Sequence, residues 1–171
     1  MAVFRDDPDD YQQLDFTLMQ NGATTLYYRT EILAEDVKWL IAHNYQVNNF
    51  DCSLWQNEEH MYSSFAETLR FPHYFGRNLA ALEDCLSDLN VSEKGGLVLV
   101  FQRYDVFTMK VPEVAWNILD IIEMKSRHYL LFGQRLLSLV QSNDAQIKFS
   151  SLGSQHANWN QREWLNVNRG L

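Results

Sequence analysis

The sequence has few cysteines, which can cross-link a small fold, and few prolines and glycines, which interrupt helices and strands. Its 171 residues include two cysteines, three prolines and seven glycines. The cysteines, Cys52 and Cys85, form no paired spacing, and a chain of this length has enough core to need no disulfide. We therefore expect two reduced, partly buried thiols.

The chain also lacks a long apolar run. The most apolar stretches, residues 115–124 and 129–140, are interrupted by charged and amide side chains, so neither predicts a membrane span. The first thirteen residues, MAVFRDDPDDYQQ, are acidic and contain no apolar segment, which is unlike a secretory signal. Together these absences predict a cytoplasmic protein.

Positive charge is scarce as well. Fourteen Lys and Arg residues against 22 Asp and Glu residues give a net charge of −8. Nucleic-acid phosphates would be repelled by such a surface, so we expect no nucleic-acid binding. A basic protein partner would be attracted, although an acidic balance is also common among cytosolic proteins. The hydrophobic content of 46% is enough for a compact core.

Signatures of enzymes and metal sites are missing too. Gly95 and Gly96 precede their predicted strand, whereas a phosphate-binding loop follows one. No Gly-x-Ser-x-Gly motif is present, and the five histidines lack the i, i+4 pairing of a helical zinc site. The cluster from Glu58 to His60 is typical of an exposed polar helix face. We predict no catalysis, cofactor or bound metal.

The most informative stretch is residues 71–89, FPHYFGRNLAALEDCLSDL. It reads as an aromatic loop entering a short helix, for which Asn78 is a suitable N-cap. Four leucines cluster on one side of that helix at helical spacing. The opposite side carries small and acidic residues: Ala80, Glu83, Asp84, Ser87 and Asp88. By itself, this pattern also fits a solvated acidic face.

The order of residues in this loop and helix resembles the barstar family of ribonuclease inhibitors. In that family the matching segment plugs the active site of a small guanyl-preferring ribonuclease of the barnase type. The resemblance implies that Asp84 is the principal inhibitory aspartate and that Tyr74 covers the catalytic histidine. It also places Gly76, Asn78 and Leu79 at loop and cap positions against the partner.

The sequence departs from the family pattern at three positions. Ala80 replaces the first helix aspartate, Glu83 replaces an aromatic residue, and Gln134 aligns with a late-helix glutamate. Two functions remain open: inhibition of a basic ribonuclease or toxin nuclease domain, or a barstar-fold interaction module without that activity. The predicted partner-binding residues are Tyr74, Gly76, Asn78, Leu79, Ala80, Glu83, Asp84, Ser87, Asp88 and Gln134.

The aromatic residues of the loop could equally close the core. We expect Phe75 to do so and Tyr74 to point outward. Gly76 is expected to supply a turn with positive φ and to allow close approach of a partner. His73 is expected to be a surface residue; if it contacts a partner, binding should depend on pH near neutrality.

The resemblance and the apolar patterns predict an α/β fold: a barstar-like parallel sheet of about three strands packed with helices. Asn-Gly at Asn21 predicts a hairpin formed by residues 16–19 and 24–28. This hairpin and a helix at 31–43 would make an N-terminal extension, residues 1–44, and residues 45–152 the barstar-like domain. Within that domain we expect strands at 45–55, 96–101 and 146–149 and helices at 57–70, 79–89, 111–125 and 127–141.

The remaining residues, 153–171, form a polar tail that contains Trp159 and Trp164. Two tryptophans are rarely left in water without a role, so we expect this tail to pack on the domain.

Overall fold

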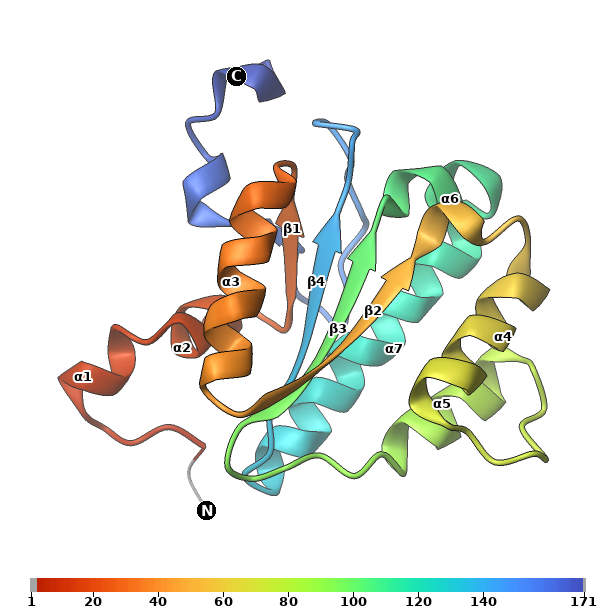
Figure 1. The fold of residues 1–171 in the computed structure, drawn as a ribbon, viewed down its shortest axis with the longest axis horizontal. Helices are drawn as coiled ribbons and strands as arrows, with labels where there is room; N and C mark the ends of the chain where they lie inside the picture. The colour runs from red at the N-terminus through yellow and green to blue at the C-terminus, as the bar shows by residue number, and fades with distance from the viewer. Residues whose placement is uncertain (1–2, 171) are drawn as a thin grey trace.

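The computed structural model describes residues 3–170 as an α/β fold built on a single five-stranded sheet (Figure 1). The strand order is β2-β3-β4-β1-β5, and every pairing between neighbouring strands is parallel. The predicted class is confirmed, with five strands in place of about three. The strands are β1 (Thr24–Tyr27), β2 (Tyr45–Asp51), β3 (Gly96–Gln102), β4 (Leu136–Gln141) and β5 (Asn158–Trp159).

Seven α-helices and three short 3-10 turns occur in the described part of the chain. The helices are α1 (Pro8–Tyr11), α2 (Leu14–Met19), α3 (Thr30–Ala42), α4 (Glu58–Leu69), α5 (Leu79–Ser87), α6 (Tyr104–Lys110) and α7 (Pro112–Leu131). The 3-10 turns are η1 (Cys52–Leu54), η2 (Gln161–Glu163) and η3 (Val167–Arg169).

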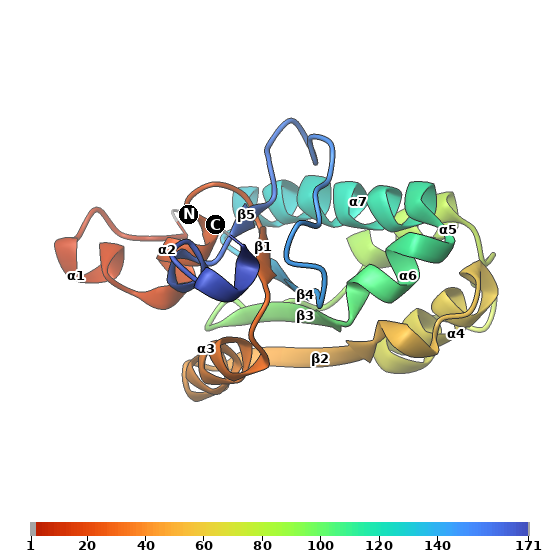
Figure 2. The same cartoon turned by 90° about the horizontal axis from the view of Figure 1, so that it is seen from above.

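The strand order explains why helices cover both faces of the sheet. The chain passes from β1 through α3 to the far edge at β2, and then returns through β3 and β4 toward β1. Parallel crossovers are almost always right-handed, so reversing the direction of travel moves the helices to the opposite face. Figure 2 accordingly shows α3 on one side of the sheet and α7 on the other.

β3 lies at the centre of both cores. Leu97, Leu99 and Phe101 pack in the larger core beneath α4 to α7. Val98 and Val100 pack in the smaller core beneath α3. Burial on both faces accounts for the continuous apolar run of this strand, which the sequence predicted correctly.

The predicted N-terminal hairpin is wrong. Residues 14–19 form α2, and β1 pairs in parallel with β4 and β5 instead of turning back on the segment before it. Leu14 and Leu18, four residues apart, pack as one helical face against the smaller core. Gly22 does have a positive φ of 116°, but the turn there leads from a helix into a strand.

The second half of the chain also differs from the prediction. The two helices expected at 111–125 and 127–141 are replaced by one continuous helix, α7, followed by β4. Gly133 has a φ of 77° just after α7 and allows the chain to reverse. All six residues of β4 are buried between β3 and β1. Residues 146–149, where the last strand was expected, do not form a strand.

Residues from the two ends of the chain meet in a buried polar network beside β1. The Asp36 carboxylate on α3 accepts hydrogen bonds from Tyr27 Oη and Asn160 Nδ2, both at 2.8 Å, and pairs with Arg162. The Glu163 carboxylate accepts from the backbone amides of Tyr28 and Arg29, at 3.1 and 2.8 Å. The C-terminal segment therefore holds the junction between β1 and α3.

A second buried carboxylate, Glu123 on α7, holds the start of β1. Its oxygens accept from the Ala23 amide at 2.9 Å and from Thr24 Oγ1 at 3.1 Å. Burial raises the pKa of this carboxyl above its ordinary value, against the opposing effect of those hydrogen bonds. The folded protein therefore binds a proton here more tightly than the unfolded chain does.

This raised pKa predicts a pH dependence of stability. Between the unfolded and folded pKa values of Glu123 the native state binds more protons, so raising the pH through that window lowers the free energy of unfolding. Glu123→Gln cannot titrate and should escape this loss. We expect the stability of the Gln variant relative to wild type to increase as the pH rises above about 4.3, the ordinary pKa of glutamate. Urea unfolding of both proteins at a series of pH values measures this difference in stability. A difference that does not change with pH would contradict the prediction.

Candidate functional site

The loop of residues 71–77 is shaped by the end of α4. Arg70 ends that helix in a left-handed conformation with φ of 55°, and the Phe71 amide donates back to the Ala66 carbonyl. A tight turn follows, closed by a 2.9 Å hydrogen bond from the Phe75 amide to the Pro72 carbonyl. The loop thus leaves α4 at a fixed angle.

The two aromatic residues of the turn point in different directions, as expected. The Phe75 ring packs edge-on against Phe71 and Tyr62, with centroid distances of 5.0 and 5.9 Å. Tyr74 is 77% exposed, and His73 beside it is also exposed. The inward ring anchors the turn, and the outward ring is available to a partner.

Gly76 does not supply the positive φ predicted for it. The left-handed residue is its neighbour Arg77, with φ of 49°. A Cβ at position 76 would lie 3.1 Å from Asn78 Nδ2, so the glycine leaves room for the helix cap. Arg77 is also fixed to α4, because its side chain pairs with Glu59 and donates to Ser63.

The helix that follows, α5, is held at both ends. Asn78 is the N-cap as predicted: its Oδ1 accepts from the Ala81 amide at 2.9 Å, and its Nδ2 donates to the Gly76 carbonyl at 3.0 Å. At the other end the Tyr129 hydroxyl of α7 donates to the Leu86 carbonyl at 2.7 Å. Leu82 is fully buried in the larger core. Both the loop and α5 are therefore rigid supports for an exposed face.

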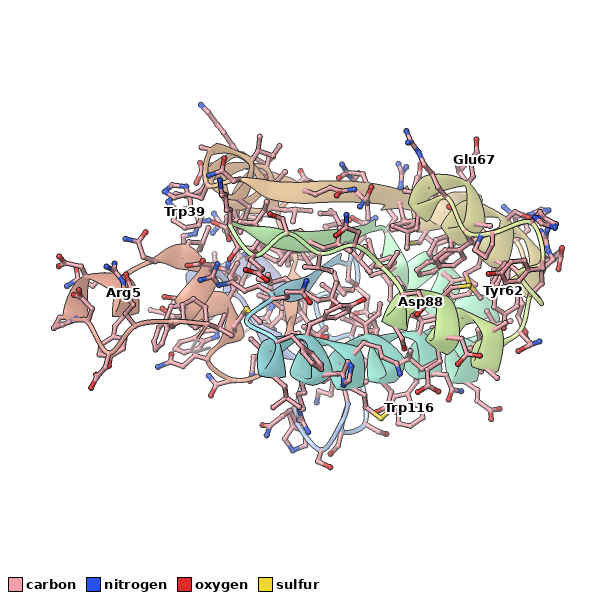
Figure 3. The ribbon with its side chains drawn as sticks, turned by 90° about the horizontal axis from the view of Figure 1, so that it is seen from below. Arg5, Trp39, Tyr62, Glu67, Asp88 and Trp116 are labelled. Carbon is pink, nitrogen blue, oxygen red and sulfur yellow. The ribbon has the colours of Figure 1, made fainter. Side chains whose placement is uncertain are left out.

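The acidic side of α5 is less uniform than its sequence indicates. Glu83 is only partly exposed and pairs with Lys125 of α7, with 2.8 Å between Oε1 and Nζ. Asp84 and Asp88, four residues apart, are exposed and form no ion pair within residues 3–170. In Figure 3, Asp88 lies at α5, between β2 and α7 in that view. The negative charge available to a partner is thus concentrated at these two aspartates.

A groove runs beside these two aspartates. Asp84, Cys85 and Asp88 line it from α5, and the loop residue Tyr74 lines it from the other wall. Arg70 also lines it, bringing a cation that sequence reasoning missed because the approach of α4 to α5 is a tertiary feature. Burial raises the pKa of the Cys85 thiol, with smaller contributions from Asp88 and Asp84, so this cysteine is a poor nucleophile.

The other predicted residues take different places. Ala80 is exposed on α5, Leu79 is half-buried at the start of the helix, and Ser87 donates to the Glu83 carbonyl at 2.9 Å. Gln134 lies outside a helix, in the turn between α7 and β4, which corrects its expected helical position. Its Nε2 donates to the Val91 carbonyl at 2.6 Å and so supports the segment that follows α5.

Two kinds of site are absent from residues 3–170. Those residues contain no group of three or more His, Cys, Asp or Glu side chains placed to hold a metal ion. Over the same range, no helix combines the length and the apolar character needed to cross a bilayer.

The fold and the loop–helix site agree with a match to a known family. The profile of the family described as Barstar (barnase inhibitor) matches residues 45–148, more than half of the chain. The chain belongs to the barstar family. The matched segment includes β2, β3, β4 and the whole loop–α5 site. A comparison with curated proteins gave no match.

The N-cap at Asn78 gives a first prediction for this barstar-family site. Asn78→Ala removes the acceptor for the Ala81 amide and should lower the free energy of unfolding by about 1 kcal/mol. Asn78→Ser keeps a capping oxygen and should lose much less. Chemical denaturation of the three proteins measures this, and equal stability of the Ala and Ser variants would contradict it.

Proposed function

We propose that this protein is an inhibitor of a ribonuclease, of the immunity type, and that it acts by occluding the nuclease active site. The observation that carries the proposal is the carboxylate of Asp84, exposed and without an ion pair among residues 3–170, beside the outward Tyr74 on a loop and helix held by hydrogen bonds. Membership of a family described as barnase inhibitors supports it.

The electrostatics fit such a partner. A ribonuclease must attract RNA and so presents cationic groups around its active site. Asp84 and Asp88 would meet these cations, and the net charge of −8 would speed the encounter. The protein itself performs no catalysis in this proposal. It acts in the cytoplasm, where a nuclease made by the same cell has to be neutralised.

The proposed footprint comprises the loop positions Tyr74 and Gly76, the start of α5 and its acidic side. Glu83 contributes less charge to it, because Lys125 already pairs with that carboxylate. Gln134 contributes by supporting the segment after α5. In keeping with the family match, we propose residues 45–152 as the inhibitory domain, with residues 1–44 and 153–171 as additions to it.

A second function is favoured by two departures from the family pattern, Ala80 and Gln134. Ala80 stands where the family pattern has an aspartate, and it is exposed on α5. Loss of that charge fits a barstar-fold interaction module that no longer inhibits a nuclease. Such a protein would keep the loop and helix but bind a partner without ribonuclease activity.

Affinity purification from the cell that makes the protein separates the two functions. Tagged wild type and Asp84→Ala would be used in parallel, and each captured fraction assayed for ribonuclease activity after denaturing release and refolding. A basic ribonuclease retained by wild type and lost with the variant supports inhibition. A partner without ribonuclease activity supports the second function, and no specific partner contradicts both.

A further inference from the structure

In the C-terminal segment after β5, polar side chains are buried and large apolar side chains are exposed, which reverses the usual arrangement. Its buried residues are polar and recur at every third position: Asn160, Glu163, Asn166 and Arg169. Its outward residues are large and apolar: Trp164 is 55% exposed, Leu165 94% and Val167 80%. We call these three residues the tail patch.

The inward polar residues are accounted for by the fold. The 3-10 turns η2 and η3 have about three residues per turn, which brings every third residue to the same side. Asn166 Nδ2 donates to Glu163 Oε2 at 2.9 Å, and the Arg169 guanidinium stacks 3.7 Å over the Trp159 ring. The segment is therefore anchored by hydrogen bonds and stacking, without burying its own apolar side chains.

The fold gives no comparable reason for the outward position of the three apolar residues. Fully burying a side chain of this size is worth about 1.5–3 kcal/mol, and the tail patch leaves most of that unused. Contiguous exposed apolar side chains mark interaction surfaces. A recess adjoins the patch: Trp164 forms part of its wall, together with Trp159, Leu14 and Leu18. The exposed residues Leu165 and Val167 thus flank in sequence a tryptophan that lines a recess of mixed polar and apolar character.

We propose that the tail patch is the contact between two copies of this chain. Around a two-fold axis, Leu165 of each copy would enter the recess of the other, because an isologous contact needs both features on one patch. The polar side chains that line the recess are, apart from Arg162, neutral hydroxyls and amides, and the amides include Asn21, Asn158 and Gln161. Amides both donate and accept hydrogen bonds, so they can pair with their own copies.

Charge favours a second copy over a charged partner. Among the described residues that line the recess, Arg162 is the one charged side chain, and it is already paired with Glu35 and Asp36. A second copy would therefore meet no uncompensated like charge there, even though each chain carries a net −8. A strongly charged partner would find no unpaired charge among the described residues that line the recess.

The tail patch is also remote from the loop–α5 site. In Figures 1 and 2 the C-terminal segment and α5 lie at opposite ends of the molecule. A dimer joined through the tail patch would leave both copies of Asp84 accessible. The proposal therefore does not depend on ribonuclease inhibition.

Mass measurement in solution tests the proposal. Light scattering coupled to size-exclusion chromatography, over a wide range of protein concentration, should give wild type twice the mass of one chain. Leu165→Asp places a charge at the contact and should give the mass of one chain. Met109→Asp is the matched control: Met109 is 80% exposed on α6, outside the tail patch, and its replacement should leave the dimer intact.

A separate control checks that the Leu165→Asp variant is folded. Leu165 is almost fully exposed, so Leu165→Asp should keep the circular dichroism spectrum of wild type; if it does not, Val167→Asp replaces it in the same measurement. A wild type that stays monomeric at every concentration overturns the proposal and leaves the patch to another protein. A dimer that persists in the folded Asp variant overturns it equally.

Discussion

Asp84→Ala is expected to weaken binding of the ribonuclease that we propose as the partner by at least ~2 kcal/mol, the usual threshold for a hot spot, for which the barstar family supplied a reference case. The reason is local. Asp84 is exposed, forms no ion pair with any residue that the structure describes, and lies in the groove beside Tyr74, so its charge is available to a cationic active site. Removing it would leave the partner's cations buried without a counter-charge.

Titration calorimetry with the captured ribonuclease measures this loss. Glu31→Ala is the matched control, because it removes one exposed carboxylate from α3, on the opposite face of the sheet. If overall charge governed binding, both variants would lose similar affinity, mainly through slower association. Equal affinities of wild type and Asp84→Ala would contradict the proposed geometry.

A comparison with Glu83 sharpens the test. Glu83→Ala removes a charge that Lys125 already neutralises, and it should therefore cost less affinity than Asp84→Ala. The two residues are adjacent in sequence, so the ranking depends on the three-dimensional contact and not on composition. A larger loss at Glu83 would move the centre of the footprint toward α7.

Glu163→Ala is expected to lower the free energy of unfolding by about 3 kcal/mol, because charged hydrogen bonds are worth roughly 1.5–3 kcal/mol each. The Glu163 carboxylate is fully buried. It accepts from the Tyr28 and Arg29 amides and lies 3.5 Å from the Arg29 guanidinium. Alanine would leave two backbone donors at the junction of β1 and α3 without acceptors.

Urea denaturation measures this loss, with Glu163→Gln as the control. Glutamine keeps an acceptor oxygen for the backbone amides and should retain part of the stability. Glu31→Ala removes an exposed carboxylate from the first turn of α3, close in sequence to the junction that Glu163 holds, and should change stability little. Wild-type stability in Glu163→Ala would show that the C-terminal segment does not hold that junction.

The loop and α5 were predicted well because their signals are local. Asn78 caps the helix through an amide three residues away, and the buried leucines repeat at helical spacing. The outward direction of Tyr74 likewise follows from a turn closed within four residues. The glycine at position 76 was misjudged, because either residue of the Gly76–Arg77 pair could take the positive φ.

The strand pairings were predicted less well because they are not local. β1 pairs with β4, which lies more than a hundred residues further along the chain, whereas the Asn21-Gly22 signal reports only on neighbouring segments. The apolar run of β4 is compatible with either a helix or a strand. It forms a strand because it pairs with β3 on one side and β1 on the other, where all of its residues are buried.

By itself, the sequence determined the fold class, the barstar resemblance, and the loop and capped helix that carry the candidate site, because caps, turns and helical periodicity act within a few residues. Only the tertiary structure decided which acidic residues stay unpaired, since Lys125 reaches Glu83 from α7. It also decided that residues from both ends complete one sheet and that the C-terminal segment turns its apolar side chains outward. These features depend on contacts between distant segments, which no local pattern encodes.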